Sequence, residues 1–150
     1  MNAIKLILTI AILTSVNLNC LGQEETSNEK LIQKMSKSAI WTPEFDAVIA
    51  SPKNHKVILE NDKVRVLEIT LMPNETENLH HHKWPSVIYI PEGNDFVDYD
   101  GEGNILIDSR KLTHPSVYPI VIYNDNDTLH QTKNVSKTKS IRLIRVEMKQ

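Results

Sequence analysis

Residues 79–93 read LHHHKWPSVIYIPEG, and this stretch decides the fold that we expect for the chain. Side chains two positions apart in a β-strand point to the same face of the sheet. His80 and His82 can therefore direct their imidazoles at one point. Neutral imidazole is the commonest protein ligand for divalent metals. A third imidazole from a distant strand, that of His130, would complete a metal site with open coordination positions, as reactive metal sites have.

On both sides of this stretch the sequence consists of short runs rich in β-branched residues. The runs are 57–59, 64–71, 79–82, 86–90, 96–99, 105–107, 117–123, 129–132 and 141–148. Turn-forming Asn, Asp, Gly and Pro separate them. No long helical pattern alternates with them, which argues against a parallel α/β sheet. The pattern predicts an all-β fold, a single small antiparallel β-barrel of the jelly-roll type with one N-terminal helix outside it.

The start of the chain has the pattern of an export signal. Lys5 precedes an apolar run from Leu6 to Val16, which has the length of a signal-peptide core and is too short for a membrane span. We expect a signal peptide over residues 1–22, cleaved near Gly22, and hence a secreted or periplasmic protein with no stable membrane span. A lipoprotein attached through Cys20, the single cysteine, is the alternative.

The rest of the chain is expected to form one structural unit with an N-terminal extension. Residues 24–40 predict a helix, because Thr26 and Glu29 have the spacing of a capping box. The Pro-rich segment that follows predicts a turn or short helix that caps the core. The predicted organisation is therefore a helix and capping segment over 23–55 and the β-barrel over 56–150.

Composition and missing motifs narrow the function. The formal net charge of −2 is too mild to indicate a nucleic-acid or anionic-membrane partner. With four glycines the chain has no phosphate-binding glycine loop, and it has no Gly-x-Ser-x-Gly motif. These observations argue against nucleotide binding and serine-hydrolase chemistry, so the expected partner is a small molecule.

The spacing of the histidines resembles the two-part signature of the cupin superfamily. The first motif of that family is Gly, five residues, His-x-His, three or four residues, Glu, six residues, Gly. The second is Gly, five residues, Pro-x-Gly, two residues, His, three residues, Asn. This chain matches those motifs in identity at His80, His82, Gly93, His130 and Asn134. The resemblance extends over roughly residues 56–148.

Several positions depart from the family pattern. Asn74 and Asp127 stand where the family has turn glycines, and Asn and Asp are the residues that next best tolerate left-handed turns. Pro119 and Asp125 also deviate. The main departure is Ser86, which occupies the position of the metal-binding glutamate, and a hydroxyl is a poor ligand for a transition metal.

The serine leaves three alternatives open. The metal could be held by three histidines, another carboxylate such as Glu68 or Asp98 could replace the glutamate, or the metal could have been lost. The resemblance implies a divalent metal (zinc, iron, manganese or nickel) and an enzyme of the oxygenase, isomerase or hydrolase type that acts on a small, anionic molecule. The alternative function is a non-catalytic small-ligand-binding cupin. Related barrels also suggest a homodimer.

Other polar residues receive structural interpretations. By strand parity His81 points away from the site and is expected on the exterior, and His55 is expected in a loop or at a sheet edge. Asn134 is expected to bond to the backbone. The acidic stretch 98–104 imitates a calcium loop, but Asp100-Gly101 is better explained as the turn of a β-hairpin. Trp84 is a candidate for the rim of the site.

Overall fold

The computed structural model describes residues 41–114, 116–125 and 128–150. Within them lie three short helices, η1 (Pro43–Phe45), α2 (Ala47–Ala50) and η2 (Ser109–Lys111). The strands are β1 (His55–Glu60), β2 (Val64–Leu71), β3 (Ser86–Ile90), β4 (Phe96–Asp100), β5 (Ile105–Asp108), β6 (Ile120–Asn124), β7 (His130–Asn134) and β8 (Ile141–Met148).

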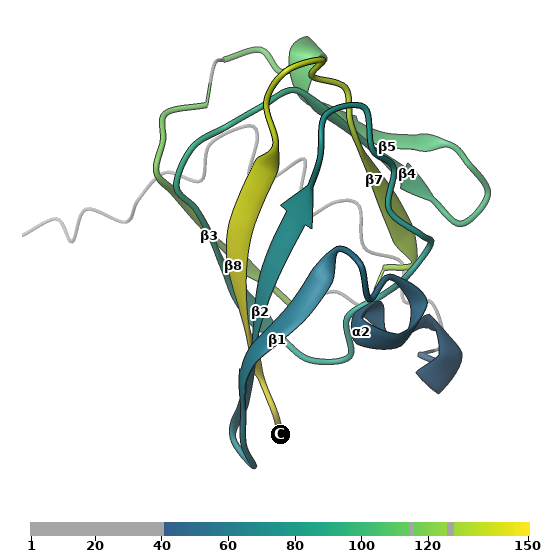
Figure 1. Cartoon of the computed structure of the whole chain (residues 1–150), viewed down its shortest axis with the longest axis vertical. Helices are drawn as coiled ribbons and strands as arrows, with labels where there is room; N and C mark the ends of the chain where they lie inside the picture. Colours follow the sequence, from purple (N-terminus) through teal and green to yellow (C-terminus); the bar gives the residue numbers. More distant parts are fainter. Residues whose placement is uncertain (1–40, 115, 126–127) are drawn as a thin grey trace, which may run out of the picture.

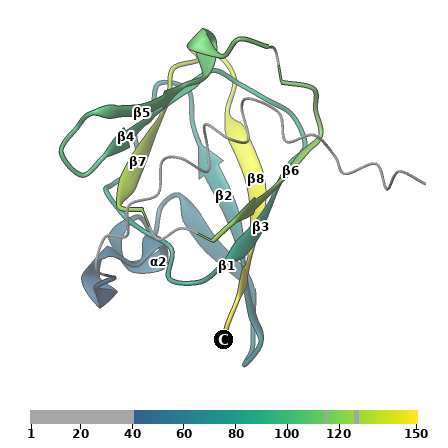
Figure 2. The same ribbon diagram turned by 180° about the vertical axis from the view of Figure 1, so that it is seen from behind.

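The strands form two antiparallel sheets (Figures 1 and 2). The larger sheet has the order β1-β2-β8-β3-β6, and the smaller has the order β5-β4-β7. Isolated bridges join Thr76 to Lys133 and His80 to His130, so the connection between β2 and β3 runs beside β7. The predicted all-β jelly roll is confirmed. Its two sheets are not closed into one continuous barrel within the described residues.

Alternating burial explains how the larger sheet forms its core. In β2 every second residue, from Arg65 to Leu71, is buried, as expected for a strand with one face toward the interior. β2 pairs with β8 along its whole length. The buried cluster consists of Leu67, Ile69 and Leu71, on which Val48, Ile141 and Leu143 pack. This apolar face forms one wall of the interior where the histidines gather.

Two strand predictions need correction. Residues 79–82 form no strand; His80 and His81 make single bridges to different partners, His130 and Asp46. His80 and His81 thus pair separately with different segments, and no ladder forms along residues 79–82. β6 begins at Ile120 rather than at residue 117, because Pro119 has no N–H to donate to a ladder.

The structure confirms the turn predictions at Asp100-Gly101 and Asn74, while Asp127 lies outside the described residues. β4 and β5 form a hairpin in which Asp100 Oδ1 accepts from the N–H groups of Glu102 (2.9 Å) and Asn104 (2.8 Å). Asp100 therefore organises the turn, as the hairpin interpretation requires. Asn74 has φ 61°, the left-handed conformation expected for the position where the cupin motif has glycine.

The segment before β1 forms the predicted cap. The N–H of Ala47, the first residue of α2, donates to the carbonyl of His81, which places this short helix against the histidine segment. The predicted helix over 24–40 and the predicted signal peptide lie outside the described residues. No helix in the described part of the chain has the length and apolarity that crossing a bilayer requires.

Candidate metal centre

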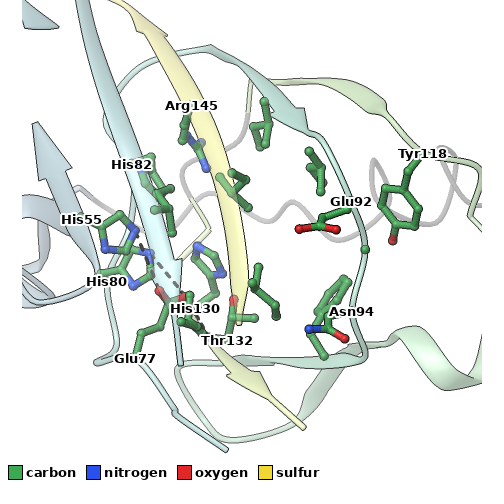
Figure 3. Close-up of a pocket in the computed structure, with 18 residues that line it drawn as sticks. His55, Glu77, His80, His82, Glu92, Asn94, Tyr118, His130, Thr132 and Arg145 are labelled. Carbon is green, nitrogen blue, oxygen red and sulfur yellow. Dashed lines mark hydrogen bonds and ion pairs between the residues drawn. The ribbon is translucent and has the colours of Figure 1, made fainter. Parts of the chain in front are cut away.

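Four histidines converge on one side of an interior cavity (Figure 3). His55 begins β1, His80 and His82 lie between β2 and β3, and His130 begins β7. The ring centroid of His80 lies 4.4 Å from that of His55, 5.1 Å from that of His82 and 4.6 Å from that of His130. The centroid of His130 is 6.0 Å from that of His82. Three separated stretches of the chain thus supply the cluster.

The tightest group within this cluster consists of His55, His80 and His82. One ring nitrogen from each lies within 4.8 Å of the others, and all three side chains are buried. The structure thus brings His80 and His82 together with His55. His130 lies beside this group but outside its 4.8 Å limit, and its role as a metal ligand stays a prediction.

Each of the four imidazoles is oriented through Nδ1 by an oxygen. His80 Nδ1 lies 2.8 Å from the Asn78 carbonyl, and His55 Nδ1 lies 3.2 Å from the Ser51 carbonyl. For the other two rings the oxygens belong to carboxylates: Glu147 Oε1 is 2.7 Å from His82 Nδ1, and Asp98 Oδ1 is 2.9 Å from His130 Nδ1.

This pattern assigns the proton of each neutral ring. A carbonyl or an ionised carboxylate can only accept, so Nδ1 must donate. Nε2 then carries the lone pair. Metal-binding histidines have this arrangement, in which the second ring N–H donates to a carbonyl or carboxylate that fixes the ring. The four Nε2 atoms are therefore prepared as ligands.

Burial keeps three of the rings uncharged. Loss of hydration lowers the pKa of His55 to about 4 and the pKa values of His80 and His82 well below the usual 6.5. Arg145 and the neighbouring rings add to the effect on His82. Neutral imidazole is the metal-binding form, so these three residues are ready to bind at neutral pH. Burial also works to lower the pKa of His130, but Asp98 outweighs it and the net shift is upward.

Glu77 is the carboxylate that faces the histidines. Its Oε2 lies 3.9 Å from His55 Nε2 and has no hydrogen-bond partner, and its Oε1 lies 4.0 Å from His80 Nε2. The N–H of Thr132 donates to Oε1 at 3.1 Å. Burial raises the pKa of Glu77 to about 7. An oxygen donor thus lies beside the imidazoles even though Ser86 replaces the expected glutamate.

The two carboxylates considered from sequence have other partners. Glu68 pairs with the largely exposed Arg142. It follows buried Leu67 in β2, so its side chain lies on the opposite face of the sheet from the core. Asp98 accepts from Thr132 Oγ1 at 2.9 Å in addition to holding His130. Ser86 is fully buried, does not line the cavity, and lies 3.4 Å from the carbonyl of Asn124 through Oγ.

The cavity beside the histidines has a volume of about 150 Å³. Its walls are mainly apolar, and the side opposite the histidines carries Glu92, Asn94 and Tyr118 (Figure 3). Gly93 is needed there because the Tyr118 ring covers it: a Cβ at this position would lie 1.8 Å from Tyr118 Cζ. The glycine of the motif thus allows a close approach at this side of the cavity.

Arg145 contributes a buried cation to the cavity wall. It is 4 % exposed, and its Nε and Nη2 have no hydrogen-bond partner. Burial lowers its pKa to about 10, so it remains charged at neutral pH. Glu147, the carboxylate paired with it at 4.0 Å, already holds His82 and Arg65.

Sequence reasoning missed His55 and Glu77. The expected loop or edge position of His55 agrees with its place at the start of the edge strand β1, but the side chain is buried and joins the site. Neither residue belongs to the His-x-His motif. The available signal was the spacing of Glu77 three residues before His80, and nothing local indicates that His55 would join them.

The other predictions for polar and aromatic residues met different outcomes. His81 points away from the site but is buried, because Trp41 and Phe45 cover its ring. Asn134 bonds to the backbone as predicted, donating to the carbonyls of Leu71 and Lys139. Trp84 does not line the cavity, and the Arg65 guanidinium lies 4.8 Å from its ring.

Comparison with solved structures identifies the architecture. A cupin-domain protein from Bordetella pertussis Tohama I is 19 % identical, with a TM-score of 0.52, and the match covers 64 % of this chain and 92 % of that one. The chain has the cupin fold. The chain matches no protein-family model and no curated protein.

Two other solved structures are similar at a lower level. A double-stranded β-helix protein from Klebsiella pneumoniae is 16 % identical over 75 % of this chain and 90 % of its own, with a TM-score of 0.45. A predicted oxalate decarboxylase from Thermotoga maritima is 18 % identical over 64 % of this chain and 79 % of its own, with a TM-score of 0.42. The fold assignment rests on the Bordetella structure.

Proposed function

We propose that this cupin binds one divalent metal ion through Nε2 of His55, His80 and His82 and acts on a small molecule in the adjoining cavity. The observation that carries the proposal is the common orientation of the rings. Each Nδ1 faces an acceptor, which leaves each Nε2 with its lone pair. The three Nε2 atoms also lie on the same side of one cavity, where they can share an ion.

The donor set fits a metal of the zinc, iron, manganese or nickel class. Imidazole and carboxylate are ligands that these ions accept. Oε2 of Glu77, which has no hydrogen-bond partner, supports Glu77 as an additional oxygen ligand, and His130 is a further nitrogen candidate. A bound dication would supply Lewis acidity to a ligand in the cavity.

If Glu77 does not ligate the metal, its carboxyl is suited to move a proton. With a pKa raised to about 7 by burial, its carboxyl is present in both forms near neutral pH. A general acid or base works best when its pKa lies near the working pH. Oε2 is the atom that would take or give the proton, because Oε1 accepts from Thr132. This supports an enzyme of the oxygenase, isomerase or hydrolase type.

A second candidate function is a non-catalytic binding protein. Two observations favour it: Ser86 stands in the position of the metal-binding glutamate, and the charged Arg145 lines the same cavity as the histidines. A guanidinium in this position opposes the binding of a cation and favours an anionic ligand. In this alternative the histidines would act as hydrogen-bonding groups.

Metal analysis of purified protein separates the two functions. We expect about one metal ion per wild-type chain, loss of the metal in His80→Ala, and retention in His114→Ala, which removes an exposed histidine outside the cavity. Elemental analysis after metal loading and exhaustive desalting provides the measurement. Absence of metal from the loaded wild-type protein would leave the binding protein as the function.

We further propose that the protein is exported after cleavage near Gly22 and that it forms a homodimer. The apolar run after Lys5 supports export. The edge strand β1 supports the dimer, because Val57, Ile58 and Leu59 are exposed there in succession. Mass determination of the protein from cell fractions tests cleavage and location, and light scattering tests the dimer.

A further inference from the structure

We propose that the Arg145 guanidinium binds the carboxylate of a small ligand whose apolar body fills the rest of the cavity. The inference rests on the proposed function in one respect, that the cavity is a ligand site. It does not require the metal. Arg145 is buried, with only 4 % of its surface exposed, and it lines the cavity.

Arg145 has apolar neighbours across the sheet on both sides. Across the sheet Arg145 pairs with Leu67 on β2 and with Ile88 on β3. Leu143, two residues earlier in β8, lies on the same inward face. A guanidinium between apolar neighbours is expensive to bury unless its donors are satisfied.

Among the described residues, no side chain accepts a hydrogen bond from Nε or Nη2 of Arg145. Its Nε and Nη2 have no hydrogen-bond partner, and Glu147 Oε1 is 4.0 Å from Nε. Glu147 already accepts from Arg65 through Oε2 and from His82 through Oε1. Its charge is therefore shared with another guanidinium. A planar acceptor with two oxygens would complement Arg145, because a guanidinium binds carboxylates in a two-pronged geometry.

The rest of the cavity wall is apolar. Besides its polar groups, the cavity is lined by Ile69, Leu71, Ile90, Phe96, Ile141 and Leu143. These side chains offer no hydrogen bonds and favour a hydrocarbon body. The volume of about 150 Å³ is that of a cavity that holds benzene. A monocarboxylate with a short branched or aromatic body therefore fits better than a hydrated inorganic anion.

The orientation of the ligand follows from β8. Arg145, Leu143 and Ile141 follow one another along the inward face of this strand. The carboxylate would lie at the Arg145 end, next to the histidines, and the apolar body would extend along Leu143 and Ile141. Figure 3 shows Arg145 and the histidines apart from Glu92 and Tyr118, which lie on the opposite side.

Calorimetric titration of the full chain, stripped of metal with EDTA, tests the inference. The probes are 4-methylpentanoate, its neutral isostere 4-methylpentanamide, and inorganic phosphate. We expect the wild type to bind the carboxylate about tenfold or more tightly than the amide, as expected for a hydrogen-bonded charge. Phosphate should bind more weakly than the carboxylate.

Two variants of the same strand sharpen the test. Arg145→Met should abolish the preference for the acid over the amide, and its apolar side chain suits the neighbouring wall. Arg142→Gln, which removes an exposed arginine of β8, should retain the preference. Far-UV circular dichroism checks that both variants fold. If Arg145→Met does not fold, the relative affinity of the wild type for the acid and the amide decides the outcome.

Equal affinity for acid and amide in the wild type, persistence of the preference in folded Arg145→Met, or tighter binding of phosphate would each overturn the inference. If the carboxylate binds only to metal-loaded protein, the role of Arg145 is refuted while the metal proposal survives. If it binds through Arg145 and no metal is ever retained, the inference stands and the metal proposal fails.

Discussion

The orientation of single imidazoles determines what the site can do. Asp98 and Glu147 each direct one ring by accepting from Nδ1, but the two carboxylates differ in their other partners. Glu147 also pairs with Arg65, whereas Asp98 has the neutral Thr132 hydroxyl. The charge of Asp98 is thus available to stabilise the imidazolium form of His130, which explains why the pKa of His130 is raised although burial opposes charge.

The first prediction concerns Asp98. In metal-free protein, Asp98→Asn should lower the pKa of His130, because burial then acts without the opposing carboxylate. Histidine ring resonances followed by NMR against pH provide the measurement. Glu102→Gln, an exposed carboxylate in the turn after β4, is the control. An unchanged His130 pKa in Asp98→Asn would contradict the assigned cause.

At the scale of elements, one ion-pair network fastens the cap to the larger sheet. Asp46 caps α2 by accepting from the N–H of Val48, and it bridges to His81 in the histidine segment. The Arg65 guanidinium of β2 binds both Asp46 oxygens, at 3.0 and 3.1 Å. Asp46, Arg65 and His81 are buried. The cap therefore holds the histidine segment in place through charged groups as well as through packing.

The second prediction is that Asp46→Ala destabilises the fold by about 3 kcal/mol or more. Without the Asp46 carboxylate, the two buried Arg65 donors Nη1 and Nη2 lose their acceptor while Glu147 still pairs with Nε, and the cap of α2 is lost as well. Urea unfolding followed by circular dichroism measures the change. Glu44→Ala, an exposed acidic residue in η1, should leave the free energy of unfolding nearly unchanged. Equal stability of the two variants would show that the network does not fasten the cap.

The elements also show what local sequence could predict. The bounds of β2, β3 and β8 agree with the predicted runs, because β-branched residues and alternating burial coincide there. The segment 79–82 failed as a strand because its residues pair singly with distant partners, which no local pattern encodes. The motif predicted His80 and His82 as site residues. His55 and Glu77 lie in the site only because of the fold, and no local sequence pattern predicted them.

For the whole molecule, the buried titratable groups make stability depend on pH. Burial lowers the pKa of His55 from its usual 6.5 to about 4 in the folded chain, so His55 favours folding above pH 6.5 and loses that contribution as the pH falls toward 4. His80 and His82 act in the same direction. Glu77 acts in the opposite direction: its pKa of about 7 favours folding below pH 4.5, and this contribution is lost as the pH rises toward 7.

The third prediction follows from these opposite signs. Between pH 4.5 and 6.5, Glu77→Gln should make the free energy of unfolding of metal-free protein rise more steeply with pH. The slope should increase by up to about 1.4 kcal/mol per pH unit, the value for one proton. Urea unfolding at a series of pH values in EDTA measures it, with Glu44→Gln as the exposed control. A slope equal to that of the wild type would mean that Glu77 is ionised throughout this range.

The most direct test of the metal centre observes the ring nitrogens themselves. The protein is labelled with ¹⁵N in its histidine rings and titrated with Zn²⁺, and the Nε2 and Nδ1 resonances are followed by NMR. We predict that the Nε2 signals of His55, His80 and His82 shift together and saturate at about one equivalent, while each Nδ1 stays protonated. Unchanged Nε2 signals at these three residues, or shifts at Nδ1, would contradict the account.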